Sequence, residues 1–172
     1  MAAMHLTLRP ATADDDAFLR DLFAAVRGPM FAGLAADVAA PLLLQQFRAQ
    51  HHGHGTAYPD AEDVIVEVGD RPVGRWLVDR GADAITLVDV AIHPDHQARG
   101  IGSELLRGLT GEADRIAARI RLSVADDNPA RGLYERFGFL QVATEGAYDS
   151  MQREPVAGHR DAAPGGLGKD GT

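Results

Sequence analysis

The stretch Asp89–Gly102, DVAIHPDHQARGIG, is the most informative part of this chain. Apolar and β-branched residues lead up to His93, which predicts a strand that ends there. A short polar loop follows, after which Gly100 and Gly102 open a helical pattern. The first N–H groups of a helix have no internal acceptor and carry partial positive charge, and glycine lets an anion approach the backbone closely. The stretch therefore predicts a strand–loop–helix unit that binds phosphate.

Two common phosphate-binding loops do not fit this stretch. A P-loop needs a lysine followed by serine or threonine after its last glycine, and no such lysine is present. The dinucleotide-binding fingerprint needs a third glycine where this chain has Leu105. The donors that remain are the backbone N–H groups from about Ala98 to Ser103, together with the charge of Arg99 and the hydroxyl of Ser103.

Outside this stretch, the residue pattern predicts a mixed α/β domain. Thr12 is a suitable N-cap for a first helix that ends at Gly28, and Asn128 is a suitable N-cap for the last helix. The order of the elements places mostly antiparallel strands first and a β-α-β crossover after them. We predict strands at about 5–9, 63–68, 73–78, 85–92, 120–124, 139–144 and 148–153, and helices at about 12–28, 34–50, 100–118 and 128–138.

Length and composition favour one globular domain. Of the 172 residues, we expect 1–154 to form the domain and 155–172, which are rich in Gly, Pro and Ala, to form a flexible tail. The 25 acidic against 17 basic residues argue against a nucleic-acid partner, and no apolar run is long enough for a membrane helix. Because the sequence has no secretory signal and no cysteine, we expect a cytoplasmic protein without disulfides or thiolate-bound metal.

Three histidines lie close together in His51–Gly55, HHGHG. Imidazole is a common metal ligand, but the glycines make the spacing irregular and no carboxylate partner is evident. We therefore interpret this segment as a polar loop after the second helix, and we expect no metal cofactor.

Two motifs resemble those of the GNAT superfamily of N-acetyltransferases. Gln97–Gly102, QARGIG, matches that family's acetyl-coenzyme A signature, Q/R-x-x-G-x-G/A. Downstream, Asn128–Phe139 resembles its second motif, N-x-x-A-x-x-x-Y-x-x-x-G-F. The resemblance extends from the first strand to about Arg153. It implies a GNAT-like fold, in which a mixed, mostly antiparallel sheet of about seven strands is flanked by about four helices.

The resemblance also implies that the chain binds acetyl-coenzyme A and transfers its acetyl group directly to a primary amine in a ternary complex. It assigns an oxyanion-stabilising backbone N–H to the fourth strand. It assigns protonation of the leaving thiolate to Tyr134, whose alternative role is a core aromatic that shares a helix face with Phe137. The oxyanion donor is Val90, Ala91 or Ile92, and the coenzyme-binding residues are Gln97, Ala98, Arg99, Gly100, Ile101, Gly102, Ser103 and Asn128.

This chain departs from the family pattern at two positions. Counted back from Tyr134, the asparagine of the second motif falls on Asp127 rather than Asn128. Either residue could face the coenzyme, and Asn128 could instead only cap the helix. Some relatives carry a glutamate base on the fifth strand, where this chain has Ser123.

The base that deprotonates the acceptor must therefore come from elsewhere. An alkylammonium group with a pKa near ~10 has to lose a proton before it attacks. Asp89 lies beside the proposed oxyanion strand and is the first candidate, with a salt-bridged or capping carboxylate as its alternative role. Glu67 and a water relay are further candidates.

The leading function is an acetyl-coenzyme A-dependent N-acetyltransferase that acts on a small-molecule, peptide or protein amine. The alternatives are a non-catalytic acyl-coenzyme A-binding or sensor module on the same fold, and a protein N-terminal acetyltransferase. We expect Gly28–Tyr58 and the last two strands to shape the acceptor site, although they carry no motif that identifies the acceptor. The resemblance also makes a homodimer possible.

Overall fold

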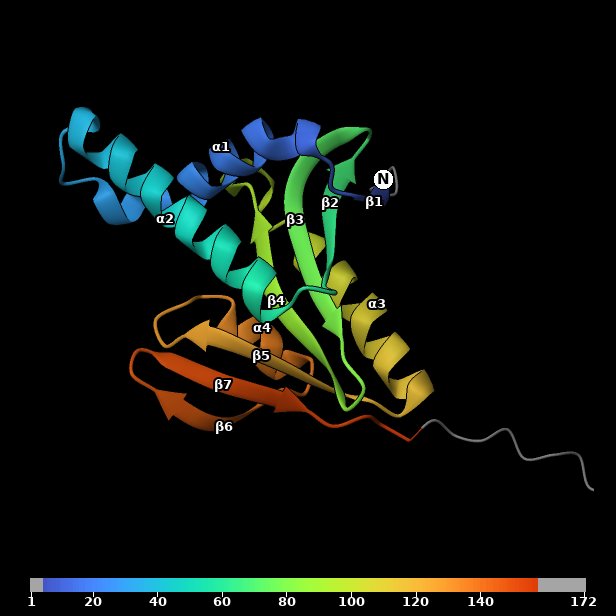
Figure 1. Ribbon diagram of the computed structural model, residues 1–172. Helices are drawn as coiled ribbons and strands as arrows, with labels where there is room; N and C mark the ends of the chain where they lie inside the picture. Colours follow the sequence, from blue (N-terminus) through green and yellow to red (C-terminus); the bar gives the residue numbers. More distant parts are fainter. Residues whose placement is uncertain (1–4, 158–172) are drawn as a thin grey trace, which may run out of the picture.

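Seven strands form one mixed sheet in the computed structural model, which describes residues 5–157 (Figure 1). The strands lie in the order β1-β2-β3-β4-β5-β7-β6, and among them only β4 and β5 are parallel. Their bounds are β1 (Leu6–Pro10), β2 (Glu62–Val68), β3 (Arg71–Arg80), β4 (Ala84–Ile92), β5 (Arg119–Ala125), β6 (Leu140–Glu145) and β7 (Tyr148–Arg153). The helices are α1 (Asp16–Arg27), α2 (Ala36–Ala57), α3 (Ile101–Ile116) and α4 (Arg131–Arg136), with short 3-10 helices at Ala13–Asp15, Gly28–Phe31 and Pro94–His96. The GNAT-like fold class predicted from the sequence is confirmed.

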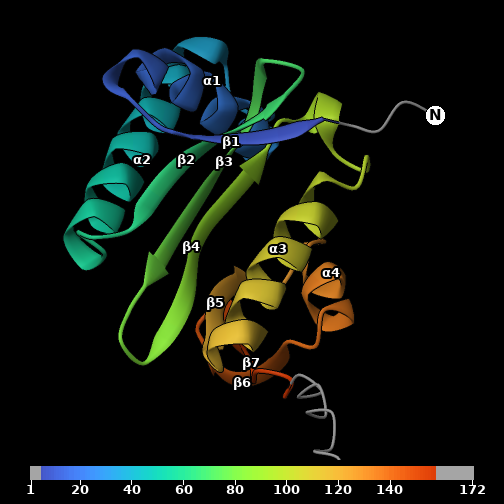
Figure 2. The ribbon, with the colours of Figure 1, turned by 90° about the vertical axis from the view of Figure 1, so that its right-hand side faces the viewer.

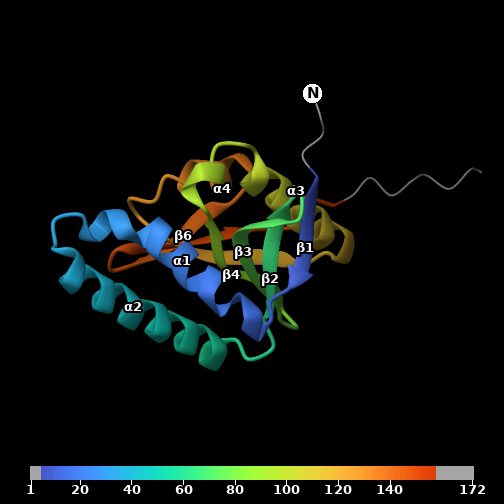
Figure 3. The same cartoon turned by 90° about the horizontal axis from the view of Figure 1, so that it is seen from above.

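The helices cover the two faces of the sheet in pairs. α1 and α2 lie on one face, and α3 and α4 lie on the other (Figures 2 and 3). The larger core lies between the sheet and α3, where Trp76 and Leu87 pack with Leu105 and Leu109. A smaller cluster under α1 and α2 contains Leu19, Phe47 and Ile65. The half of the sheet formed by β5, β7 and β6 is not covered by α1 or α2 (Figure 1).

Two helices differ from the sequence prediction. α2 continues to Ala57, so the segment His51–Gly55, which we expected as a loop, forms its last turns. Each glycine lowers helix stability by about 1 kcal/mol relative to alanine, but tertiary packing outweighs this cost, because Phe47 is buried and its ring stacks on His51. α4 is shorter than predicted and begins at Arg131, because residues 128–130 form a turn.

For the expected absence of a metal cofactor and of a membrane helix, the structure gives information on residues 5–157 only. Within residues 5–157, no group of three or more histidine, aspartate or glutamate side chains is arranged to hold a metal ion. No helix in the same range combines the length and apolar character needed to cross a membrane. Of the expected tail at 155–172, residues 158–172 lie outside the described residues, and Val156 donates a backbone hydrogen bond to Asp114.

Candidate functional site

The parallel strands β4 and β5 separate halfway along β4. They pair from Ala84 with Arg119 to Leu87 with Leu122, and not beyond. β5 continues in register with β7, whereas β4 continues only with β3 (Figure 1). The β5-facing backbone edge of β4 beyond Leu87 is therefore free to bind a ligand. Val90, Ala91 and Ile92, the predicted oxyanion donors, lie on this part of β4.

The start of α3 presents an unbroken row of free backbone donors. Within the described chain, none of the six successive N–H groups from Ala98 to Ser103 donates a hydrogen bond, and the first one that does is that of Glu104, to the Gly100 carbonyl. A helix alone leaves about four such donors, and the preceding loop adds the others. These groups lie at the positive end of the helix dipole, so they form a site for an anion of the size of a pyrophosphate.

The loop that presents these donors is held in an unusual backbone conformation. Ala98 has φ +57° and Gly100, the N-cap of α3, has φ +85°. The Gln97 side chain donates from Nε2 to the Ile92 carbonyl over 2.9 Å and so ties the loop to the end of β4. Gln97, predicted to bind the coenzyme, thus also braces the loop.

The other predicted coenzyme residues contribute in different ways. Arg99 is exposed and, in the described structure, forms no ion pair, so its charge is available to a phosphate. The Ile101 side chain is buried in the core, which leaves only its backbone for binding. A Cβ atom on Gly102 would lie 3.1 Å from Leu133 Cδ2, so this glycine also lets α3 pass close to α4.

The structure gives Asn128 a local role. Its Oδ1 accepts a hydrogen bond from the Ala130 N–H over 2.9 Å, which fixes the turn before α4. This is close to the capping role considered as its alternative. The Asn128 and Asp127 side chains are both exposed.

Tyr134 is a buried residue of α4. Its ring packs edge-on against Phe139, with the two ring centroids 5.9 Å apart. The aromatic ring that packs on Tyr134 is thus that of Phe139, and not that of Phe137 as the sequence suggested. Burial, with a smaller contribution from the charge of Asp89, raises the pKa of Tyr134 to about 12. The phenol is therefore protonated throughout the neutral pH range and can act as a proton donor.

A β-bulge in β4 determines the direction of Asp89. Leu77 lies opposite Asp89, but the next residue, Val78, lies opposite Leu87, so Val88 is an extra residue on β4. The extra residue shifts the alternation of side chains along the strand. Leu87 consequently packs in the core beneath α3, whereas Asp89 lines a cavity beneath α1 and α2.

Asp89 has only a weak ionic contact. The nearest cation is Arg75, whose Nη1 lies 3.5 Å from Asp89 Oδ2. Arg75 gives its two short hydrogen bonds, of 2.8 and 2.7 Å, to the carboxylate of Asp63. Burial therefore outweighs the attraction of Arg75 and raises the pKa of Asp89 above its usual range. A carboxylate with a raised pKa is a stronger base than a free one.

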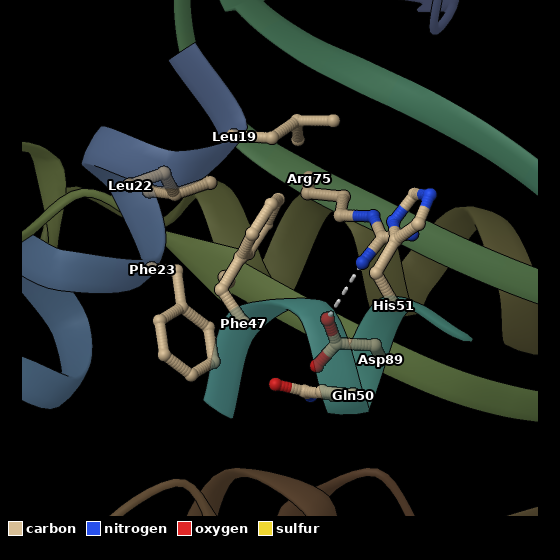
Figure 4. Close-up of a pocket in the computed structure, with 9 residues that line it drawn as sticks. Leu19, Leu22, Phe23, Phe47, Gln50, His51, Arg75 and Asp89 are labelled. Carbon is tan, nitrogen blue, oxygen red and sulfur yellow. Dashed lines mark hydrogen bonds and ion pairs between the residues drawn. The ribbon is translucent and has the colours of Figure 1, made fainter. Parts of the chain in front are cut away.

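Asp89 borders a small cavity of about 30 Å³ between the sheet and the two helices that cover it. Figure 4 shows Arg75 and Asp89 facing His51 and Gln50 of α2. The remaining walls are apolar and include Phe47. α2 thus forms part of the wall of this cavity, while the expectation that residues 28–58 and the last two strands shape the acceptor site stays a prediction.

Glu67, the other candidate side chain for the base, is less suitable, and Ser123 does not replace the glutamate that some relatives carry on the fifth strand. Glu67 accepts a short hydrogen bond of 2.7 Å from Arg9 and lies at the β1 edge of the sheet, away from β4. Ser123 is exposed on β5 and, as a neutral hydroxyl, is a poor base. Sequence reasoning missed Arg75, which the fold brings to Asp89 from β3, and His54, which α2 places one turn beyond the cavity-lining Gln50 and His51.

Comparison with known proteins agrees with this geometry. Residues 60–141 match the model of the acetyltransferase (GNAT) domain. No curated protein matches the sequence significantly.

Many solved structures share the fold, at low sequence identity. The PaiA N-acetyltransferase of Thermoplasma acidophilum, solved in complex with coenzyme A, is 16% identical with a TM-score of 0.68, over 88% of this chain and 99% of that one. An acetyltransferase from Thermus thermophilus is 24% identical with a TM-score of 0.64, over 90% and 99% of the two chains. A Corynebacterium glutamicum structure, named as histone acetyltransferase HPA2 and related acetyltransferase, is 21% identical with a TM-score of 0.62, over 91% and 99%.

The family match and the fold lead to the same assignment as the two sequence motifs. The matched residues include the parted strands, the anion-binding loop and α4. The chain carries an acetyltransferase domain of the GNAT family.

Proposed function

We propose that this protein transfers an acetyl group from acetyl-coenzyme A to a primary amine. The observation that carries the proposal is the row of six free N–H groups, from Ala98 to Ser103, beside the point where β4 and β5 separate. Bound acetyl-coenzyme A would supply an activated acetyl thioester. The row of N–H groups and Arg99 would hold its pyrophosphate, and the free edge of β4 would accept its extended arm as an added strand.

The two proposed catalytic groups lie on opposite faces of the sheet. Asp89 faces α1 and α2, whereas Tyr134 belongs to α4 on the other face. The gap between β4 and β5 beyond Leu87 lies between these two faces, so a thioester bound in it could be reached from both sides. We assign Asp89 as the base that takes a proton from the acceptor ammonium, and Tyr134 as the acid that protonates the leaving thiolate.

The acceptor would approach from the face of α1 and α2. Asp89 and the Gln50 side chain provide oxygen atoms for an ammonium group, and the apolar walls of the cavity suit its carbon chain. The cavity of about 30 Å³ has room for about one water molecule, so only the reacting amine and not the body of the acceptor would enter it. The acceptor is therefore a primary amine of a small molecule, peptide or protein, presented end-on.

Binding of the coenzyme is tested by thermal melts and calorimetry with acetyl-coenzyme A. At about 100 times its dissociation constant, the coenzyme should stabilise the fold by roughly 2.7 kcal/mol. Gly102→Glu should abolish this effect, because it adds a negative charge in the first turn of α3 beside the six free N–H groups, although its Cβ would also contact Leu133 of α4. The matched control is Gly111→Glu on the same helix, where an added Cβ has open space and binding should be unchanged. An unchanged midpoint for the wild type at saturating coenzyme would refute the proposal.

Catalysis is tested by free-thiol release in the presence of a panel of amines, with mass spectrometry of the products. Acetylated amine from at least one class of acceptor is the expected result. Tight coenzyme binding without transfer to any amine would instead assign the protein to the non-catalytic, coenzyme-sensing class.

A further inference from the structure

The C-terminal half of α2 directs one face at Asp89. Phe47, Gln50, His51 and His54 are spaced at i, i+3, i+4 and i+7, which places them on one side of the helix. The first three line the cavity that Asp89 borders (Figure 4). His54 continues this face toward the C-terminal end of the helix, and its ring is partly buried.

The imidazole of His54 lies between the protein interior and solvent. Its Nδ1 is buried and, among residues 5–157, has no hydrogen-bond partner, although the residue as a whole is only partly buried. A buried imidazole nitrogen without a partner is rare, because the unmade hydrogen bond costs about 1–3 kcal/mol. A buried ring nitrogen without a partner, on a residue that is partly exposed, suits a proton relay between the interior and solvent.

The charged groups around His54 come from three strands and from α2 itself. They are Asp89 on β4, Arg75 on β3, Asp63 on β2 and, on α2 itself, His51. Burial lowers the pKa of His54, and burial raises the pKa of Asp89, on which Arg75, Arg27 and Asp63 also act. The two shifts act in the directions that bring the proton affinities of the carboxylate and the imidazole closer together.

We propose that His54 relays to solvent the proton that Asp89 takes from the acceptor ammonium. This inference rests on the proposed function. The ammonium loses one proton to Asp89, and the amine nitrogen forms a bond to the acetyl carbon as the C–S bond breaks. The thiolate takes a proton from Tyr134, which recovers one from the nitrogen of the new amide. Because Nδ1 of His54 has no direct partner among the described residues, a water molecule would carry the proton from Asp89 to it. Nε2 then releases a proton to solvent, so each turnover releases one proton.

The first test does not depend on activity. The histidine signals of the full chain are followed by NMR as a function of pH, with His54 assigned from the His54→Gln variant. Because the charge of Asp89 raises the pKa of His54, Asp89→Asn should lower that pKa further. An identical His54 titration in the wild type and in Asp89→Asn would overturn the relay, because the two groups would then not interact.

The second test measures turnover of an acceptor from the amine panel. In His54→Gln we expect kcat to fall by about tenfold, less than the 10²- to 10⁴-fold typical of a direct proton donor or acceptor, with KM for acetyl-coenzyme A unchanged. At pH 7 the remaining rate should rise with buffer concentration, and free imidazole should restore part of the activity of His54→Ala. His52→Gln is the matched control, since His52 is exposed on the same helix.

The outcomes separate the relay from the proposed function. A wild type that acetylates no amine would overturn both. An active wild type with a His54→Gln variant of normal kcat would overturn the relay alone. A variant that is slow but insensitive to buffer and to imidazole would also overturn the relay, because His54 would then have only a structural role.

Discussion

Two aspartates that each lie beside an arginine behave in opposite ways in this fold. Asp15, at the start of α1, accepts two hydrogen bonds from Arg9, of 2.8 and 2.7 Å, and a third from the Thr12 N–H at 2.8 Å. Asp89 on β4 has a single contact of 3.5 Å, with Arg75. The hydrogen bonds from Arg9 hold the pKa of Asp15 well below its usual range, whereas burial raises the pKa of Asp89.

The difference depends on whether the neighbouring guanidinium is already bound. Arg9 directs Nε to Glu67 and both terminal nitrogens to Asp15. Arg75 directs Nε and Nη2 to Asp63 and leaves only Nη1 near Asp89. A carboxylate that is fully hydrogen-bonded anchors the fold, while one that is desolvated and weakly paired remains available as a base.

The largest effect should come from neutralising Asp89. Asp89→Asn keeps the shape of the side chain but removes the proton acceptor, so kcat should fall by about 10³-fold, within the range for general base catalysis. Asp15→Asn, the matched change at the anchoring carboxylate, should leave kcat within about twofold, because Asp15 is bound to Arg9 and does not line the cavity beside Asp89. Steady-state kinetics with saturating acetyl-coenzyme A measures both. Equal losses of kcat in the two variants would show that Asp89 and Asp15 do not differ in role.

A smaller loss of activity should follow removal of the Tyr134 hydroxyl. Tyr134→Phe retains the ring that packs on Phe139, so stability and coenzyme affinity should change little. A coenzyme thiol, with a pKa near ~8.5, is a tolerable leaving group without help, so we expect kcat to fall by about 10²-fold at constant KM. Wild-type kcat under conditions where chemistry limits the rate would return Tyr134 to a purely structural role.

The part of the site that could be predicted from the sequence is local. The anion-binding loop spans a few consecutive residues, Gln97–Ser103, and its free N–H groups follow from its position at the start of a helix. The strands and the helix α3 were likewise predictable, because hydrophobic periodicity reflects which face of an element is buried.

The acceptor side could not be predicted in the same way. Asp63, Arg75 and Asp89 come from three strands, and the bulge at Val88 that aims Asp89 at α2 leaves no residue signature. Without that bulge, Asp89 would lie on the same face as Leu87, in the core beneath α3. One signal was available, because Arg75 interrupts the apolar run 73–78, and a charge buried in a strand needs a partner.

The position of the histidines was missed for a different reason. Glycines at 53 and 55 argue locally for a loop, but tertiary packing carries α2 through them to Ala57. The helix places two of the three histidines, His51 and His54, on the same face.

Replacing Asp63 should convert Asp89 from a weakly paired carboxylate into one that is hydrogen-bonded to Arg75. Asp63→Asn releases Arg75, which can then turn its short hydrogen bonds to Asp89 and lower the pKa of that carboxyl. Because Asp89 must be ionised to act as a base, the acidic limb of the pH profile of kcat/KM should move to lower pH. The plateau of the profile should fall by roughly tenfold, since a weaker base is a poorer catalyst. Glu67→Gln, on the same strand but bound to Arg9, is the control and should leave the limb in place. A limb that stays fixed in Asp63→Asn would mean that Arg75 does not control Asp89.

The smallest effect is on stability. Replacing Asp15 and replacing Asp89 should change the stability of the fold in opposite directions. A carboxyl whose native pKa is lowered stabilises the fold above its unfolded pKa of about 3.9, and this contribution is lost as the pH falls toward the native pKa. Asp15→Asn should therefore destabilise the protein by about 2 kcal/mol at pH 7, and by less in acid.

Asp89 should show the reverse dependence. A carboxyl whose native pKa is raised costs stability once the pH exceeds its unfolded pKa of about 3.9, and the cost grows until the pH passes the native pKa. Asp89→Asn should thus raise the melting temperature at pH 7 and have almost no effect near pH 3. Melting curves of the wild type and both variants between pH 3 and 8 measure this. At pH 7 the melting temperature should be below that of the wild type in Asp15→Asn and above it in Asp89→Asn, and both differences should shrink in acid. If Asp89→Asn were instead destabilising at pH 7, the Asp89 carboxylate would be an anchor like Asp15, and its assignment as the base would fail even if the activity of the variant were low.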